Sequence, residues 1–430
     1  MKTVQIQLLL TGDELMSGDI VDSNSAMIAK KLQQAGYSVS KRVTVGDDVE
    51  QLKQEIAVLS AVSDVLIVNG GLGPTVDDLT AEVLALVVGQ PLEENAQALS
   101  HLETWCTTRN FKLDGPNRKQ ALLPKGVEIV PNPVGSAVGF AVDHNDCWVV
   151  CTPGVPSELE KMLDQTILQE INKRFPSEDK TSVSHLPVFG LGESKVQQMI
   201  SEHMPDWPIA VELGFRASLP IIDVKLTTRT LEGERARADC LDRLKVLLGA
   251  HIISEQEETL PQRVVGLLQQ QGKTLATAES CTGGLIASQI TSIAGASSVF
   301  EMGVVSYSNR IKSHLLAVDP AVIEQHGAVS QQVVYQMAQG ALSQSGSDYC
   351  IAVSGIAGPD GGTEEKPVGT VWVAWGDSQN IKTEILYFPG PRGYFQQVVA
   401  AVGLDLIRRR LLGIEETPLY FKQRKFKGHR

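Results

Sequence analysis

The chain has 430 residues, 38 lysines and arginines against 50 aspartates and glutamates, and a formal net charge of −12. This length exceeds what one ordinary hydrophobic core holds and predicts roughly two to four domains. The acidic balance argues against a general nucleic-acid-binding or membrane-surface role for the body of the chain.

The six cysteines are scattered along the chain without a C-x-x-C pair. This spacing matches neither a zinc site nor a disulfide framework, so we expect reduced thiols and a cytoplasmic protein. No apolar run reaches the roughly 18 residues that a membrane span requires, and Met1–Leu8 is typical of a strand and not of a signal peptide. We therefore expect no association with a membrane.

Strands alternate with helices in a first segment, residues 1–172. Three strand-like runs each continue into a loop rich in glycine, proline or acidic residues. Such units predict a doubly wound α/β sheet whose site lies along the edge where the strands end. We expect strands at Val4–Leu10, Asp64–Asn69 and from Trp148, loops at Thr11–Ile20, Gly70–Asp78 and Pro153–Pro156, and helices at Asn24–Ala35 and Leu79–Val88.

The glycine-rich loop Gly70–Asp78 is the first candidate site. Its glycines let backbone amides approach a phosphate closely, although a single loop of this kind is a weak signal. Two carboxylates follow, Asp77 and Asp78, and they suit either a divalent cation beside a diphosphate or a simple helix N-terminus. A second acidic loop favours the metal; its carboxylates are Asp13, Glu14 and Asp19.

The second segment, residues 173–253, predicts a small α+β module similar to a KH domain. It lacks the G-x-x-G motif with which KH domains hold nucleotides. A structural or interdomain role is therefore favoured over RNA binding. The expected elements are strand Val183–Phe189, helix Glu193–His203, strands Ile209–Phe215 and Ile221–Thr228, helix Glu232–Leu248 and strand His251–Ser254.

The third segment, residues 254–414, contains the turn Thr277–Gly284 between a strand-like run and a helical pattern. This turn brings a hydroxyl, Ser280, and a thiol, Cys281, to the start of a helix, where backbone N–H groups favour an anion. The arrangement suits a nucleophile with an oxyanion hole. It equally suits a helix cap beside a packed cysteine.

The last residues, 415–430, are basic from Phe421 onward and are expected to form a solvated tail, with a docking function as the alternative.

Several motifs resemble the CinA family along the whole chain. The first segment is similar to its N-terminal domain, which is related to the MoaB/MogA molybdopterin-binding fold; that fold also allows pterin binding. The third segment is similar to its C-terminal domain, the nicotinamide mononucleotide (NMN) deamidase, also called PncC. The motifs that carry the resemblance are Thr11–Leu15 with Asp22–Asn24, Gly70–Asp78, Asn117–Gln120, Pro153–Glu158, Ala278–Gly284, Val305–Asn309 with Lys312, His326–Ser330, Ser354–Gly362 and Glu365–Thr370.

The resemblance implies Ser280 as the nucleophile of amide hydrolysis, with Cys281 as the rival. No histidine offers an evident triad, since His314 and His326 have no acid partner in view, so Tyr307 and Lys312 are candidates for the base, as in Ser-Lys enzymes. Both could instead be ordinary surface residues. Substrate-binding residues are expected at Thr282, Gly283, Gly284 and Asn309, in the loop with Gly355, Gly358 and Gly361, and at Arg392, which could pair with a phosphate or be solvated.

At the N-terminal site the resemblance implies a divalent-metal-dependent ADP-ribose pyrophosphatase that yields AMP and ribose 5-phosphate. Substrate would contact Asn24, Gly71, Gly73 and Thr75, and Asp77 and Asp78 would hold Mg, Mn or Co. No cofactor is expected at the deamidase site.

The sequence thus predicts an α/β enzyme of pyridine-nucleotide salvage that acts on NMN and ADP-ribose, is a homodimer like other chains of this type, and does not bind nucleic acid. The alternative is a non-catalytic ligand-binding protein linked to competence or DNA damage.

Overall fold

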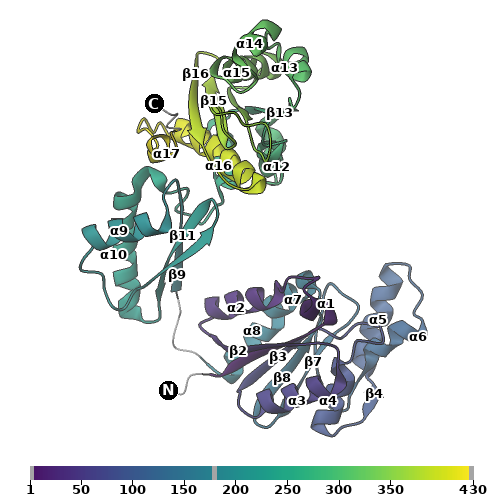
Figure 1. Cartoon of the computed structure of the whole chain (residues 1–430). Helices are drawn as coiled ribbons and strands as arrows, with labels where there is room; N and C mark the ends of the chain where they lie inside the picture. The colour runs from purple at the N-terminus through teal and green to yellow at the C-terminus, as the bar shows by residue number, and fades with distance from the viewer. Residues whose placement is uncertain (1–3, 177–181, 426–430) are drawn as a thin grey trace. The chain divides into compact units, whose positions relative to one another are not determined.

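The computed structural model describes residues 4–176 and 182–425, which divide into two compact units. The first comprises Met1–Ser182 with Arg229–Leu231, and the second comprises Val183–Thr228 and Glu232–Arg430 (Figure 1). The middle segment therefore groups with the C-terminal segment by its contacts. Within the described residues, no helix is both long and apolar enough to cross a membrane.

The first unit alternates strands and helices in the order expected from its hydrophobic pattern. Its elements are β1 (Ile6–Thr11), α1 (Asp13–Ser17), α2 (Asn24–Gln34), β2 (Val39–Val45), α3 (Val49–Ser60), β3 (Val65–Asn69), α4 (Thr80–Val88), β4 (Leu92–Glu94), α5 (Ala96–Thr108), α6 (Gly115–Arg118), η1 (Lys119–Ala121), β5 (Leu122–Pro124), β6 (Glu128–Val130), β7 (Gly139–His144), β8 (Cys147–Thr152), α7 (Pro156–Met162), the π-helical turn η2 (Leu163–Ile167) and α8 (Leu168–Arg174).

The large sheet of this unit has the strand order β2-β1-β3-β8-β7-β6. The strands β2, β1, β3 and β8 are parallel, and β7 and β6 complete the sheet in antiparallel pairs. Successive residues of a strand point to opposite faces, so Leu8 packs with Ile28 of α2 while Leu9 packs with Ile56 of α3. Helices cover both faces, which confirms the predicted doubly wound α/β fold.

The second unit contains the middle module and a second α/β sheet. Its elements are β9 (Ser182–Phe189), α9 (Glu193–His203), β10 (Glu212–Ser218), β11 (Ile221–Thr228), α10 (Leu231–Leu248), η3 (Gly249–His251), α11 (Leu260–Gln271), β12 (Leu275–Glu279), α12 (Leu285–Thr291), η4 (Ala296–Ser298), β13 (Phe300–Val305), α13 (Asn309–Leu316), α14 (Pro320–His326), α15 (Gln331–Ser345), β14 (Tyr349–Gly355), β15 (Thr370–Asp377), β16 (Asn380–Tyr387), α16 (Arg392–Leu411) and α17 (Leu419–Gln423).

The middle module has a three-stranded sheet in the order β10-β11-β9 and follows the expected sequence of elements except at its end. The strand expected at His251–Ser254 is wrong. The chain forms the 3-10 turn η3 there, and Ile252 makes a single bridge to Val188. The carbonyl groups of Ala250 and Ile252 accept hydrogen bonds from Arg408 of α16, so they are not free to build a ladder.

The C-terminal sheet has the order β13-β12-β14-β15-β16, with β13, β12 and β14 parallel. Successive side chains of β12 again point to opposite faces of the sheet and belong to different hydrophobic cores. Leu275 belongs to the core shared with α11, α12 and α16, whereas Ala276 and Ala278 belong to the core shared with α15. The turn after β12 therefore lies at the edge where the parallel strands end.

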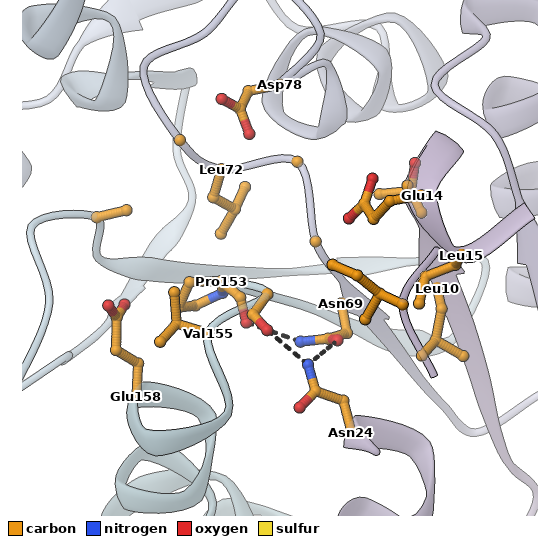
Figure 2. A pocket seen from close by; sticks show the side chains of 18 of the residues that line it. Leu10, Glu14, Leu15, Asn24, Asn69, Leu72, Asp78, Pro153, Val155 and Glu158 are labelled. Carbon is orange, nitrogen blue, oxygen red and sulfur yellow. Dashed lines mark hydrogen bonds between the residues drawn. The ribbon is translucent and has the colours of Figure 1, made fainter. Parts of the chain in front are cut away.

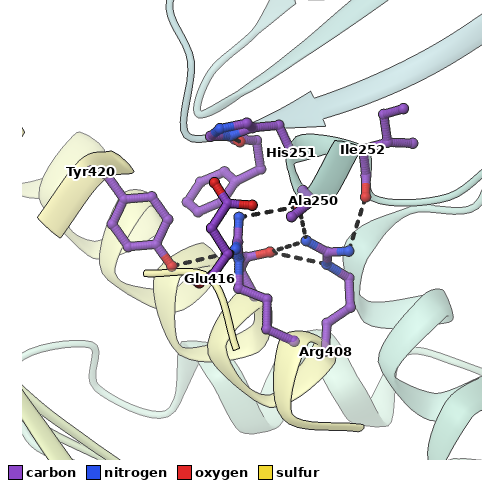
Figure 3. Close-up of polar contacts among 9 residues, drawn as sticks. Ala250, His251, Ile252, Arg408, Glu416 and Tyr420 are labelled. Carbon is purple, nitrogen blue, oxygen red and sulfur yellow. Dashed lines mark hydrogen bonds and ion pairs between the residues drawn. The ribbon is translucent and has the colours of Figure 1, made fainter. Parts of the chain in front are cut away.

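A buried ion cluster joins the middle module to the C-terminal helices (Figure 3). The carboxylate of Asp405 accepts hydrogen bonds from the side chains of Arg408 and Arg409, and the Tyr420 hydroxyl donates to it at 2.9 Å. All four side chains are almost fully buried. Both guanidinium groups also donate to the carbonyl oxygen of Ala250, so the cluster ties the end of α10 to α16 and α17.

The start of the C-terminal tail is not solvated as expected. Tyr420 and Phe421 are buried in α17, where Phe421 packs edge-on against Trp375 with 5.8 Å between ring centroids. The aromatic pair at the head of the basic run explains the difference, because burying two large rings outweighs the cost of ordering one helical turn. Residues 426–430 of the tail lie outside the described residues.

The cluster predicts that Tyr420→Phe will lower the free energy of unfolding by about 1.5–3 kcal/mol, since it leaves a buried carboxylate one donor short. Chemical denaturation monitored by circular dichroism measures this change. Tyr335→Phe, at an exposed position on α15, is the matched control and should change stability by less than about 0.5 kcal/mol. Equal effects of the two substitutions would contradict the role of the cluster.

Candidate functional site

The loops that follow β1, β3 and β8 enclose a cavity of about 540 Å³ in the first unit (Figure 2). These are the three loops that the sequence places at the carboxyl ends of parallel strands. Of the expected residues, Asn24, Gly71, Gly73, Asp77 and Asp78 line the cavity together. Further lining comes from residues to which the sequence assigned no role in binding, among them Asp22, Asp47, Asn69, Gln120 and Glu158.

The side chains of two asparagines join these loops through hydrogen bonds. The Asn24 side-chain amide donates to Asn69 Oδ1 at 2.9 Å and to the Gly154 carbonyl at 2.7 Å. Asn69 in turn donates to the Thr152 hydroxyl at 3.1 Å and to the Pro153 carbonyl at 2.7 Å. Figure 2 shows the hydrogen bonds of this pair, and both residues line the cavity. Asn24 therefore shapes this wall by joining α2 to the loops after β3 and β8.

The two aspartates of the glycine-rich loop differ in their surroundings. One oxygen of Asp78 accepts hydrogen bonds from the backbone N–H and the hydroxyl of Thr75, whereas Asp77 is exposed. Gly73 allows this fold of the loop, since a Cβ there would lie 2.6 Å from the Asp78 carboxylate. Thr75 is not among the residues that line the cavity, and its hydroxyl donates to Asp78; its expected contact with substrate stays a prediction.

The carboxylates fit a divalent ion only in part. Among the described residues, no three His, Cys, Asp or Glu side chains form a cluster able to hold a metal. Mg²⁺ in phosphate-transfer sites is often held by one or two carboxylates together with substrate phosphates and water. Asp77 and the free oxygen of Asp78 fit that type of site and not an all-protein cage.

In the second unit, Ser280 and Lys312 lie in direct contact. Lys312 Nζ lies 3.0 Å from Ser280 Oγ, 2.8 Å from the Ser306 carbonyl and 3.5 Å from the Tyr307 carbonyl. The lysine side chain comes from α13 and is buried, and burial lowers its pKa. The register of β12 and β13 brings Lys312 to Ser280. Because Glu279 pairs with Val305 at the end of these strands, the loops after β12 and β13 leave the sheet side by side.

Glu279 is a residue of this site to which the sequence gave no role. It is fully buried, and its carboxylate accepts the Thr282 hydroxyl at 2.7 Å and three backbone N–H groups of the turn and of α12. These are the amides of Gly284, Ile286 and Ala287, at 3.1, 3.0 and 2.8 Å. Glu279 stands at the end of an apolar strand, directly before the turn, and this position is the sequence feature that could have indicated its role.

This arrangement corrects the expectation that Thr282, Gly283 and Gly284 all present their amides to substrate. The Gly284 amide is bound to Glu279, and the Gly283 amide donates to the Ser280 carbonyl at 3.2 Å. The amides of Cys281 and Thr282 face the Cys281 sulfur, where their hydrogen bonds lower the pKa of the thiol against the larger opposing effect of burial.

The rival nucleophile Cys281 is buried in the core between β12 and α16. Burial raises the pKa of its thiol to about 12. A thiol with so high a pKa is almost fully protonated near neutral pH, and the thiolate is the reactive form. The geometry thus separates a packed thiol from a hydroxyl that touches a buried amine.

Arg392 connects the remaining candidates of this site. Its guanidinium donates to the Gly358 carbonyl and to the Tyr307 hydroxyl, each at 2.9 Å. The Tyr307 ring is largely exposed, and only its carbonyl reaches Lys312. Gly355 ends β14, and Gly358 and Gly361 have positive φ values of 76° and 88° in the loop beyond it. Asn309, which begins α13, is exposed and makes no side-chain hydrogen bond to this group among the described residues.

Two family models match the chain. One, described as the CinA C-terminal domain, covers residues 257–411, and the other, described as a probable molybdopterin binding domain, covers residues 7–173. A CinA-like protein of Colwellia psychrerythraea is 52% identical over 429 residues, which is 99% of each chain. A CinA-like protein of Citrifermentans bemidjiense is 41% identical over 417 residues, which covers 96% of this chain and 99% of that one.

Among solved structures, a CinA superfamily protein of Klebsiella pneumoniae is 35% identical and covers 36% of this chain and 96% of its own, with a TM-score of 0.35. The full-length relatives match both units and the module between the two family matches. The chain belongs to the CinA family.

Proposed function

We propose that the second unit hydrolyses the amide of NMN to nicotinate mononucleotide and ammonia, with Ser280 as nucleophile and Lys312 as base. The observation that carries the proposal is the set of three contacts around Lys312 Nζ. The carbonyl oxygens of Ser306 and Tyr307 can only accept, so they take two N–H bonds of Lys312 in either charge state, and the mechanism uses the amine in its neutral form. The lone pair of that amine is then left for the Ser280 hydroxyl.

The contacts support an acyl-transfer sequence in which protons balance. The Ser280 oxygen would attack the amide carbon while its proton passes to Lys312, and backbone amides of the turn would hold the oxyanion. The same proton then leaves with the amide nitrogen as ammonia, and water hydrolyses the ester. Arg392 and the glycine loop at Gly358 would bind the phosphate, whose charge matches the guanidinium.

The nucleophile can be tested by a pair of neighbouring substitutions. Ser280→Ala should lower NMN deamidation at least about a hundredfold, equivalent to about 2.7 kcal/mol in barrier. Cys281→Ala should do much less, because the thiol is packed in the core. Ammonia release from NMN measures both. An inactive Cys281→Ala beside an active Ser280→Ala would reverse the assignment, and no ammonia from the wild type would favour a non-catalytic binding protein.

The proposed role of Lys312 as the base predicts how kcat for NMN depends on pH. Lys312 must be neutral to accept a proton, so kcat should rise with pH through its pKa, which burial places below the ordinary lysine value. Lys312→Arg keeps the charge but has no titratable amine near neutral pH. We expect a large fall in kcat with a modest change in KM. Steady-state NMN kinetics between about pH 6 and 9 measure this; a kcat like that of the wild type would exclude Lys312 as the base.

We further propose that the first unit hydrolyses ADP-ribose to AMP and ribose 5-phosphate. The supporting observation is the cavity between three strand-end loops, which combines glycine backbone with acidic side chains. Asp77 and Asp78 would hold a divalent ion there, and that ion would neutralise the charge of the diphosphate. Pterin binding is the alternative that the same cavity allows.

Metal removal should separate the two activities. Chelation with EDTA should abolish ADP-ribose hydrolysis and leave NMN deamidation nearly unchanged, since the proposed Ser280–Lys312 chemistry uses no metal. Both activities are measured in one preparation, and added Mg²⁺, Mn²⁺ or Co²⁺ should restore the lost one. Equal loss of both activities would contradict the proposal of two different chemistries.

A further inference from the structure

Glu158 is an acidic residue in the wall of the cavity of the first unit, and it is less exposed than Asp77. It follows the start of α7, lines the cavity and is partly buried (Figure 2). One oxygen accepts a hydrogen bond from Asn132 Nδ2 at 2.8 Å. The loop beside it is shaped to admit the carboxylate, because a Cβ at Gly135 would collide with it. The second carboxylate oxygen has no acceptor role in the described hydrogen bonds.

The groups that face Glu158 set its charge. Burial raises the pKa of its carboxyl, while the Asn132 hydrogen bond and the charge of His101 on α5 act in the opposite direction. His101 is fixed by a 2.9 Å contact with the Gly135 carbonyl. Asp77, by contrast, is exposed on the glycine loop. Carboxyl groups in one pocket with such different environments are suited to different roles in acid–base chemistry.

We propose that Glu158 is the general base that activates water for hydrolysis of the diphosphate, an inference that rests on the proposed function of the first unit. The water oxygen forms a bond to one phosphorus atom, and its proton passes to the Glu158 carboxylate. The bond from that phosphorus to the bridging oxygen breaks, and its electron pair stays on the bridging oxygen of the second phosphate. Glu158 thus acts apart from Asp77 and Asp78, which face the diphosphate charge.

The test is Glu158→Gln in the full chain, with Mg²⁺ and ADP-ribose. This change keeps an acceptor for Asn132 but removes the base, so kcat should fall at least about a hundredfold while KM changes little. In the wild type, kcat should rise with pH through a pKa above that of an ordinary glutamate, and the variant should lose this rise. Glu160→Gln, at an exposed position on the same helix, is the matched control and should behave like the wild type.

The outcomes are distinguishable. A Glu158→Gln variant with the kcat of the wild type, or with a raised KM alone, would overturn the base while leaving ADP-ribose hydrolysis in place. A wild-type chain that leaves ADP-ribose intact would overturn both. If Glu158→Gln melts at a lower temperature than Glu160→Gln, Glu158→Ala with added formate replaces it: restored turnover supports the base, and absence of rescue contradicts it.

Discussion

The buried carboxylate of Glu279 is the interaction on which the C-terminal site depends. A buried carboxylate without a cation is costly unless its oxygens are fully hydrogen-bonded. Here four donors, one from the Thr282 hydroxyl and three from backbone amides, meet it at the N-terminus of α12, where the helix dipole also favours negative charge. The turn between β12 and α12 is thereby fixed around one side chain, and Ser280 is the residue that this turn presents.

One consequence concerns the charge of the substrate. Because Glu279 occupies the amides at the start of α12, this helix end is already neutralised and is a poor place for a phosphate. Arg392 is a positive group of this site whose described hydrogen bonds go to neutral partners, the Tyr307 hydroxyl and the Gly358 carbonyl. In the proposed reaction, the turn would therefore receive the amide and the Gly358 loop would receive the phosphate.

The two units place different side chains on the same architecture. In each, parallel strands end at one edge of a sheet, and glycines there allow the backbone to turn sharply and closely. The first unit lines this edge with carboxylates such as Glu14, Asp78 and Glu158, and the second with a hydroxyl and a buried amine. The Asp405 cluster adds rigidity of another kind, since it fixes the middle module on the C-terminal helices through the carbonyl of Ala250.

The sequence by itself predicted many of the strands and helices and their order, because hydrophobic alternation and glycine-rich turns are local signals. It also identified the turn at Ser280 and named Lys312 as a candidate base. Contacts between distant residues were decided by the tertiary structure alone: Ser280 with Lys312, Asn24 with Gly154, and Tyr420 with Asp405.

Contacts between distant residues also explain where the structure differs from what the sequence predicts. Whether a tail is solvated, whether a strand forms at His251–Ser254, and whether the Gly284 amide is free all depend on what packs against the segment. A local pattern records which groups a residue offers for bonding, but burial and partner choice are set by residues tens or hundreds of positions away. Partner identity at Glu279, Asp405 and Glu158 is therefore a property of the fold and not of the motif.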